Sequence, residues 1–153
     1  MKKWLTPFLV LGALFALTGC GTGNSELLSR GLHISLNNIA RTADGTYEIS
    51  WQVENPNVVV YVVDHSEHKI YVDGVLVGTI SKKGRQGVPV QNKAEGIDPM
   101  KLASPAAGER LAQAIGQGPV SYRVESAIWL LLSDDETSKS SLVSTGTVSV
   151  TAK

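Results

Sequence analysis

The stretch that decides the fold is WQVENPNVVVYVVDHSEHKIYVDGVLVG, from Trp51 to Gly78. Its Asn55-Pro56-Asn57 break ends an alternating strand, because proline donates no backbone hydrogen bond and keeps the preceding residue extended. A run rich in β-branched residues follows, which favours a second strand. Asp73-Gly74 then stands between two apolar runs, and an Asp-Gly pair in that setting predicts a tight β-hairpin.

Alternation of apolar and polar residues predicts the other strands, at 32–37, 47–53, 120–125 and 143–151, since a period of two turns one face of a strand to a core. The run 58–63 and the hairpin arms 70–72 and 75–77 add more. Residues 88–90 suit a short edge strand, where proline is tolerated. Polar segments predict a bend at 64–69, a basic loop at 81–87 and a surface turn at 134–141, whereas strand pairing in 88–102 is undefined.

One helix is predicted after residue 104. Ser104 can cap it, Pro105 suits the first helical position, and Gly116 or Gly118 can end it. Ala107 and Leu111 lie on one face at helical spacing, which predicts a lid packed on one end of a sheet. About seven short strands with frequent turns and one helix therefore predict an all-β antiparallel sandwich.

The composition fits one folded domain. Hydrophobic residues make up 42% and charged residues 18% of the 153 positions, which is typical of a globular chain and not of a disordered one. Without Lys2 and Lys3 of the leader, 12 basic residues face 14 acidic ones, so the mature chain lacks the basic face of a nucleic-acid-binding protein. The single cysteine, Cys20, excludes an intrachain disulfide and cannot alone form a cysteine-based zinc site.

Residues 1–19 have the parts of a signal peptide. Lys2 and Lys3 supply positive charge, and residues 7–17 form an apolar run too short for a permanent membrane-spanning helix. The sequence Leu17-Thr18-Gly19-Cys20 resembles the bacterial lipobox. An ordinary secreted protein or an uncleaved anchor helix is the alternative interpretation.

The lipobox resemblance implies cleavage before Cys20 and acylation of Cys20, which makes membrane lipid the expected partner. Two or three acyl chains anchor a protein durably, whereas one holds it only marginally. Residues 20–30 then form a lipidated flexible tether. Lipoproteins kept in the inner membrane typically carry Asp at the position of Gly21, so the resemblance implies the outer membrane of a bacterial envelope, facing the periplasm.

The mature chain resembles the late embryogenesis abundant type 2 family, whose domain is also called the water stress and hypersensitive response domain. The resemblance rests on the strand 47–53, Asn55-Pro56-Asn57, the Asp73-Gly74 hairpin, the strand after Pro119 and the terminal strand with Gly146. It implies that residues 31–153 form an immunoglobulin-like or fibronectin-III-like β-sandwich linked to desiccation or other stress, without established catalytic residues. The irregular segment 90–102 departs from the family pattern.

Three kinds of binding or catalytic site were considered. His65 and His68 lie three positions apart beside acidic residues, but a fourth metal ligand is not evident, which favours a solvated turn. The sequence contains neither a Gly-x-Ser-x-Gly element nor a phosphate-binding glycine loop. Trp51 is expected in the core with a partner for its indole N–H, and stacking on a ligand is the alternative. We therefore expect no catalytic residues, cofactor or metal.

Two classes of function follow. In the first, a non-enzymatic, membrane-tethered domain protects or contacts envelope components, with an envelope protein, a lipid headgroup or a glycan as its partner. In the second, the domain is an accessory or ligand-binding subunit of an envelope transport or assembly system.

The lipobox interpretation makes a direct prediction. Cys20→Ser removes the only sulfur that can carry the diacylglyceryl group, so the variant is expected to stay unprocessed or to become soluble. Cell fractionation and the mass of the N-terminal peptide measure both outcomes. A correctly processed variant recovered in membranes at the wild-type level would contradict the interpretation.

Overall fold

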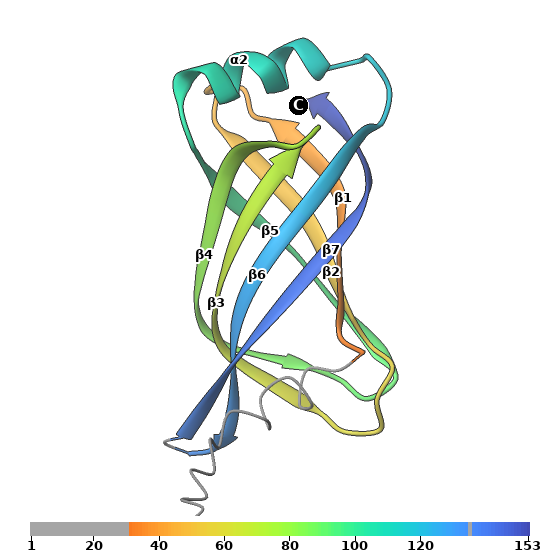
Figure 1. Ribbon diagram of the computed structural model, residues 1–153, viewed down its shortest axis with the longest axis vertical. Coiled ribbons are helices and arrows are strands. Elements are labelled where there is room, and N and C mark those ends of the chain that lie inside the picture. The colour runs from red at the N-terminus through yellow and green to blue at the C-terminus, as the bar shows by residue number, and fades with distance from the viewer. Residues whose placement is uncertain (1–30, 135) are drawn as a thin grey trace, which may run out of the picture.

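The computed structural model describes residues 31–134 and 136–153, which form seven strands and one helix. The strands stand side by side around a long interior, and the helix lies across one end (Figure 1). The signal peptide 1–19 with Leu17, Thr18 and Gly19, and the tether 20–30 with Cys20, lie outside the described residues. These assignments stay predictions.

Most of the strands are longer than the average of five or six residues. In chain order the elements are β1 (His33–Arg41), β2 (Tyr47–Asn55), β3 (Tyr61–Val72), β4 (Val75–Val88), β5 (Asn92–Leu102), α2 (Pro105–Ala114), β6 (Val120–Ser133) and β7 (Glu136–Ala152).

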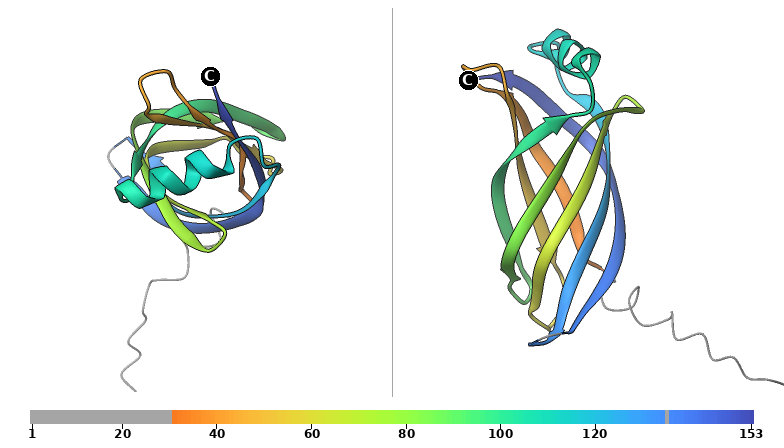
Figure 2. Two further views of the ribbon diagram at one scale, coloured as in Figure 1. Left: turned by 90° about the horizontal axis from the view of Figure 1, so that it is seen from above. Right: turned by 90° about the vertical axis from the view of Figure 1, so that its left-hand side faces the viewer.

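The sheet is closed into a barrel in the order β1-β2-β5-β4-β3-β6-β7, and seen from above the strands form a ring with α2 across it (Figure 2). All neighbours pair antiparallel except β1 and β7, which close the ring in parallel. The all-β class with seven strands and one short helix is confirmed, but the predicted two-layer sandwich is wrong. Alternation shows which face of a strand is buried, and sandwiches and barrels both bury one face.

One joint of the barrel is hydrogen-bonded over only part of its length. β4 and β5 pair at Gly78–Leu102 and Thr79–Lys101, close to the helix. β5 pairs with β2 along nearly its whole length, so over residues 92–100 it has a free edge towards β4, a setting in which Pro99 is tolerated. We call this unpaired joint, between residues 80–88 and 92–100, the seam.

The predicted hairpin is confirmed. β3 ends at Val72, β4 begins at Val75, and the two turn residues Asp73 and Gly74 have φ of 46° and 79°. Two consecutive positive φ values define the tight turn that matches the twist of the flanking strands, and Asp and Gly are among the residues that adopt it most readily. The Asp73 carboxylate also accepts hydrogen bonds from the backbone N–H and hydroxyl of Ser121, which ties the turn to β6.

Two polar segments expected between strands belong to strands instead. The predicted bend 64–69 lies within β3, and the predicted basic loop 81–87 lies within β4. Their inward positions are occupied by polar side chains, among them Ser66, His68 and Lys82, so the apolar alternation that marks a half-buried strand is missing.

Two other segments that the sequence predicts as strands lie outside the strands. The apolar residues 58–60 lie in the β2–β3 loop, and residues 89 and 90 lie in the β4–β5 connection. The undefined segment becomes β5 from Asn92. The turn expected at 134–141 is shorter, because β7 already begins at Glu136.

The helix α2 forms as predicted and covers one end of the barrel (Figure 1). The Ser104 side chain accepts a hydrogen bond from the backbone N–H of Ala107, Pro105 occupies the first turn, and Gly116 follows the helix with φ of 75°. Leu111, on the side of the helix that faces the core, is fully buried. Within the described ranges, no helix is long and apolar enough to cross a membrane.

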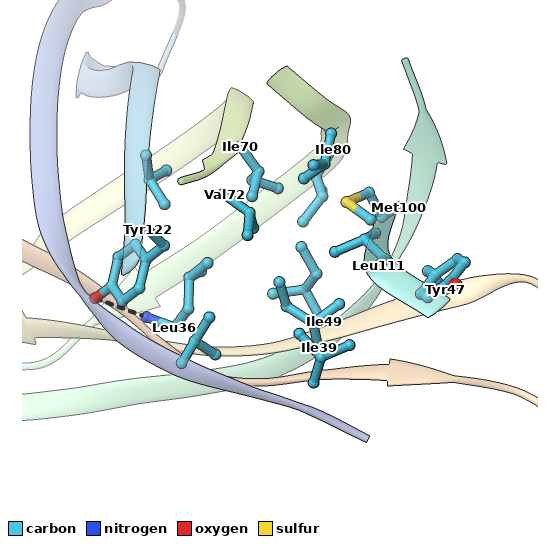
Figure 3. Close-up of a cluster of buried hydrophobic side chains, with 14 of the residues drawn as sticks. Leu36, Ile39, Tyr47, Ile49, Ile70, Val72, Ile80, Met100, Leu111 and Tyr122 are labelled. Atoms are coloured by element: carbon cyan, nitrogen blue, oxygen red, sulfur yellow. Dashed lines mark hydrogen bonds between the residues drawn. The ribbon is translucent and has the colours of Figure 1, made fainter. Parts of the chain in front are cut away.

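The interior holds two apolar clusters. The larger one lies beneath α2 and includes Ile39, Ile49, Ile70 and Leu111, all without solvent exposure (Figure 3). The smaller one consists of Leu32, Val88, Ile128 and Leu130.

Tyr122 adds a polar link inside the larger cluster. Its hydroxyl accepts a hydrogen bond from the backbone N–H of Leu36, where a bulge interrupts the pairing of β1 with β2 (Figure 3). A Cβ at Gly146 would lie 2.9 Å from this hydroxyl, which accounts for glycine there.

Asn55, the first residue of the predicted break, is fully buried. Its Nδ2 lies 2.8 Å from the carbonyl oxygen of Val59, 2.9 Å from that of Pro89 and 3.3 Å from that of Val88. Its Oδ1 accepts a hydrogen bond from the backbone N–H of Asn57. One side chain therefore joins the β2–β3 loop to the β4–β5 connection.

We expect Asn55→Ala to destabilise the fold by about 3 kcal/mol, because it leaves buried backbone groups without partners. Asn37→Ala is the matched control at an exposed asparagine, with an expected change below about 0.5 kcal/mol. Urea unfolding of both variants measures the difference. Equal midpoints for Asn55→Ala and the wild type would contradict this role.

Candidate functional site: polar groups inside the barrel

Trp51, which the sequence predicts in the core, has a polar partner for its indole N–H. The side chain lies on the inner side of β2, partly buried against the larger cluster, and its Nε1 donates to Asp98 Oδ2 over 2.6 Å. The neighbouring position on β5 is Gly96, where a Cβ would lie 2.5 Å from the indole ring. The core placement and the expected N–H partner are confirmed, and glycine at 96 makes room for the ring.

Asp98 connects the two sides of the seam. Its Oδ2 lies 3.3 Å from Lys82 Nζ, and that ammonium also stands 4.7 Å from the centre of the Trp51 ring. The side chains of Lys82 and Asp98 are 30% and 18% exposed, so water screens this pair less than an ordinary surface ion pair. The ion pair joins β4 to β5, the indole hydrogen bond joins β2 to β5, and the cation–π contact joins β4 to β2. These contacts lie in the seam, where backbone hydrogen bonds are missing.

His68 lies deeper, on the inner face of β3. Its Nδ1 is hydrogen-bonded to Ser126 Oγ at 2.8 Å and its Nε2 to Ser66 Oγ at 2.9 Å. Burial lowers the pKa of His68 from 6.5 to about 4, while the Asp98 charge opposes this change and the Lys82 charge adds to it. The ring is therefore neutral at pH 7, with both nitrogens engaged by hydroxyl groups.

A cavity of about 40 Å³ lies between the two apolar clusters and is bordered by His68, Ser66, Lys82 and Trp51. Most of the remaining lining is apolar, from residues such as Leu36, Ile70 and Val124. A water needs at least about 10–15 Å³ on this measure, so the space is large enough for only a few waters. Ligand pockets reach about 300–1,000 Å³, so the cavity is several-fold smaller than a typical ligand pocket.

His65 and His68 point to opposite faces of β3. His65 lies outside, stacked on Trp129 with ring centres 4.1 Å apart, whereas His68 faces the interior. The two rings are therefore not placed to share a metal ion. Within residues 31–134 and 136–153, no group of three or more His, Cys, Asp or Glu side chains is arranged to hold a metal ion.

The structure places the motif residues at a loop and a turn. Asn55 is the buried tie described above, Pro56 and Asn57 continue the β2–β3 loop, and Asp73 with Gly74 forms the hairpin turn. Sequence reasoning missed Lys82, Asp98, Ser66 and Ser126. Lys82 and Asp98 each alternate with apolar residues at spacing two, Ile80 and Met100, which is the signal that would have placed them inside.

No family model and no curated protein matches this sequence. Solved structures do match. The solution structure of AT1g01470 from Arabidopsis thaliana is 15% identical, with a TM-score of 0.51 over 79% of this chain and 80% of that one. The fold resembles AT1g01470.

Two further structures are similar at lower scores. A candidate late embryogenesis abundant (LEA) protein, At2g46140.1, is 9% identical with a TM-score of 0.49, over 84% of this chain and 76% of that one. A protein from Archaeoglobus fulgidus is 16% identical with a TM-score of 0.46, over 76% of this chain and 92% of that one. The likeness to AT1g01470 agrees with the expected resemblance to late embryogenesis abundant proteins at the level of the fold alone.

The buried histidine predicts a pH dependence of stability. The pKa of His68 is lower in the folded chain than in the unfolded one, so the unfolded state binds the proton more readily between pH 6.5 and 4. Stability should therefore be complete above pH 6.5 and fall as the pH drops towards 4, with a loss of about 3 kcal/mol.

Urea unfolding at a series of pH values from 7 to 4 measures this loss. His68→Gln has no proton to bind in this range, so its stability should fall less steeply than that of the wild type. Identical slopes for the two proteins would contradict the assignment to His68.

Proposed function

We propose that this protein is a non-enzymatic lipoprotein of the bacterial envelope, with residues 31–153 held at the membrane by acylated Cys20. The observation that supports it is the Leu17-Thr18-Gly19-Cys20 sequence directly after an apolar run, eleven positions before the first described residue, Gly31. The same sequence motivates an outer-membrane location facing the periplasm, because Gly21 follows the cysteine.

In this proposal the outer surface of the barrel contacts the partners. The interior cavity is several-fold smaller than a ligand pocket, and its polar side chains bond one another. Partners would accordingly meet the loops and the outer walls. An envelope protein, a lipid headgroup or a glycan is the class of partner that such a tethered domain meets.

A role under water stress is the second part of the proposal. It rests on the resemblance of the strands and turns to the late embryogenesis abundant type 2 domain, and the likeness in fold supports it. A domain of this kind would protect envelope components by contact and not by catalysis.

A deletion strain tests this part of the proposal. Its survival on drying and osmotic shock is expected to fall below that of the wild type and to return with a plasmid copy, but not with a Cys20→Ser copy. Unchanged survival under drying, osmotic shock and envelope stress would refute the protective role.

An accessory subunit of a transport or assembly system is the alternative function. The outer wall of β4, β3, β6 and β7 has a hollow of about 510 Å³, lined by charges of both signs from Glu67, Lys69 and Glu125 and by the exposed Val143. Such a surface fits a protein partner with a mixed polar face. Crosslinking in intact cells, followed by pull-down through a C-terminal tag, would recover one stoichiometric partner if this alternative holds.

A further inference from the structure

The β2–β3 loop reverses the usual distribution of residues between core and surface. Asn55 is fully buried, while the next apolar residues, Val58, Val59 and Val60, are 78%, 50% and 61% exposed. The backbone beneath them is bonded to the Asn55 side chain through the carbonyl of Val59. The buried Asn55 side chain therefore holds the loop backbone while the three valines are exposed to solvent.

A fourth valine belongs to the same surface. Val90, 42% exposed, lies in the β4–β5 connection. The Asn55 amide binds the carbonyls of Val88 and Pro89, and the backbone N–H of Gln91 donates to the carbonyl of Asn57. We call Val58, Val59, Val60 and Val90 the valine tip. It is one surface built by two adjacent loops.

The valine tip stands apart from the other exposed apolar residues. The others are each 41–66% exposed but lie on four separate strands: Val75, Ile97, Leu132 and Val143. Single exposed apolar side chains need no explanation. Three consecutive exposed valines and a fourth on the adjoining, hydrogen-bonded loop form an apolar surface, and contiguous apolar surfaces mark interaction sites. Residues 55–60 and 88–92 contain no charged side chain, so moving this surface out of water strips no ionic group of its hydration.

The valine tip lies where the chain joins the barrel. A Cβ on Gly31 would be 3.2 Å from the Pro56 ring and 3.5 Å from the Asn57 side chain, so the first described residue packs on the same loop. This end of the barrel is opposite α2 (Figures 1 and 2). Ten residues lie between Cys20 and Gly31. The eleven residue-to-residue steps span at most about 40 Å when extended, about the length of the 12-residue strand β3.

We propose that the valine tip inserts into the interface of the bilayer that holds the lipid anchor, so that the barrel stands on the membrane by this end. This inference rests on the proposed tethering through Cys20 and adds a second contact. Acyl chains hold the protein in the membrane, and the valines fix which end faces it. Apolar side chains of peripheral proteins typically enter about 5–10 Å into the headgroup and acyl boundary.

Site-specific fluorescence tests the orientation on the processed lipoprotein, reconstituted in vesicles of phosphatidylethanolamine and phosphatidylglycerol. Acylation blocks the Cys20 sulfur, so Val59→Cys provides one reactive thiol for a polarity-sensitive dye. Gln113→Cys on α2 and Val143→Cys on the β7 wall are matched controls at exposed positions. Nitroxide groups on the lipid, placed just below the headgroups, should quench the dye at 59 about fivefold more than at 113 or 143, given that insertion depth.

Each outcome of this test is distinct. Equal quenching at the three positions of an anchored protein would overturn the orientation and leave the tether intact. A dye at 59 that is shielded from water but not quenched by lipid would indicate a protein partner or a second copy on the valine tip, and would also overturn it. A freely labelled Cys20 would refute the tether, and the orientation with it.

A second set of variants keeps the inference testable without a dye. The triple variant Val58→Ser, Val59→Ser and Val60→Ser should increase the exchange of deuterium at the backbone amides of 57–61 in the vesicle-bound protein, towards the rate of the same protein in detergent. Val143→Ser, at an equally exposed valine, should leave these amides unchanged. No difference between the serine variant and the wild type on vesicles would contradict the contact.

Discussion

The barrel depends on the side-chain contacts that close the seam, where β4 and β5 lack backbone hydrogen bonds. Within the seam, the ion pair of Lys82 with Asp98 joins β4 to β5, and Trp51 supports this pair with its indole N–H and its ring face. His68, with its two hydroxyl partners, and a small cavity lie beside this pair on the inner side of the barrel. These polar groups lie between the two apolar clusters of the core.

The polar side chains on the inner side of the barrel form two separate groups. His68 is bonded to the hydroxyl groups of Ser66 and Ser126, and Asp98 is bonded to Lys82 and Trp51. Their bonds hold strands together, so removing one partner would leave a buried polar group unsatisfied. On the outer surface, the valine tip and the hollow over β4, β3, β6 and β7 differ most clearly from an ordinary polar exterior.

Local sequence signals predicted the local structure well. The Asp73-Gly74 turn, the Ser104 cap and the alternating strand through Trp51 all depend on neighbours a few residues away. Prediction failed where a distant residue decides the outcome. Lys82 looked like part of a solvated loop because its carboxylate partner, Asp98, lies 16 positions further along the chain. Val58–Val60 looked like a strand because β-branched residues favour one. The Asn55 side chain instead joins this loop to the carbonyls of Val88 and Pro89, 33 and 34 positions further along the chain, and the three valines are exposed. The closed barrel could not be predicted either, because the alternation of apolar and polar residues along a strand does not show which strand edges pair.

The number of strands has a geometric consequence. Neighbours alternate in direction around the ring, and with seven strands the alternation cannot be completed, so β1 and β7 run the same way. β1 consequently begins at the end of the barrel opposite α2, and the chain reaches Lys153 at the α2 end, where the Lys153 backbone N–H donates to the carbonyl of Arg41. In a barrel of hairpins with an even number of strands, the last strand would finish at the end where the first one begins. In this one, the start of β1 and the end of β7 are separated by the full height of the barrel, which strand length and tilt determine.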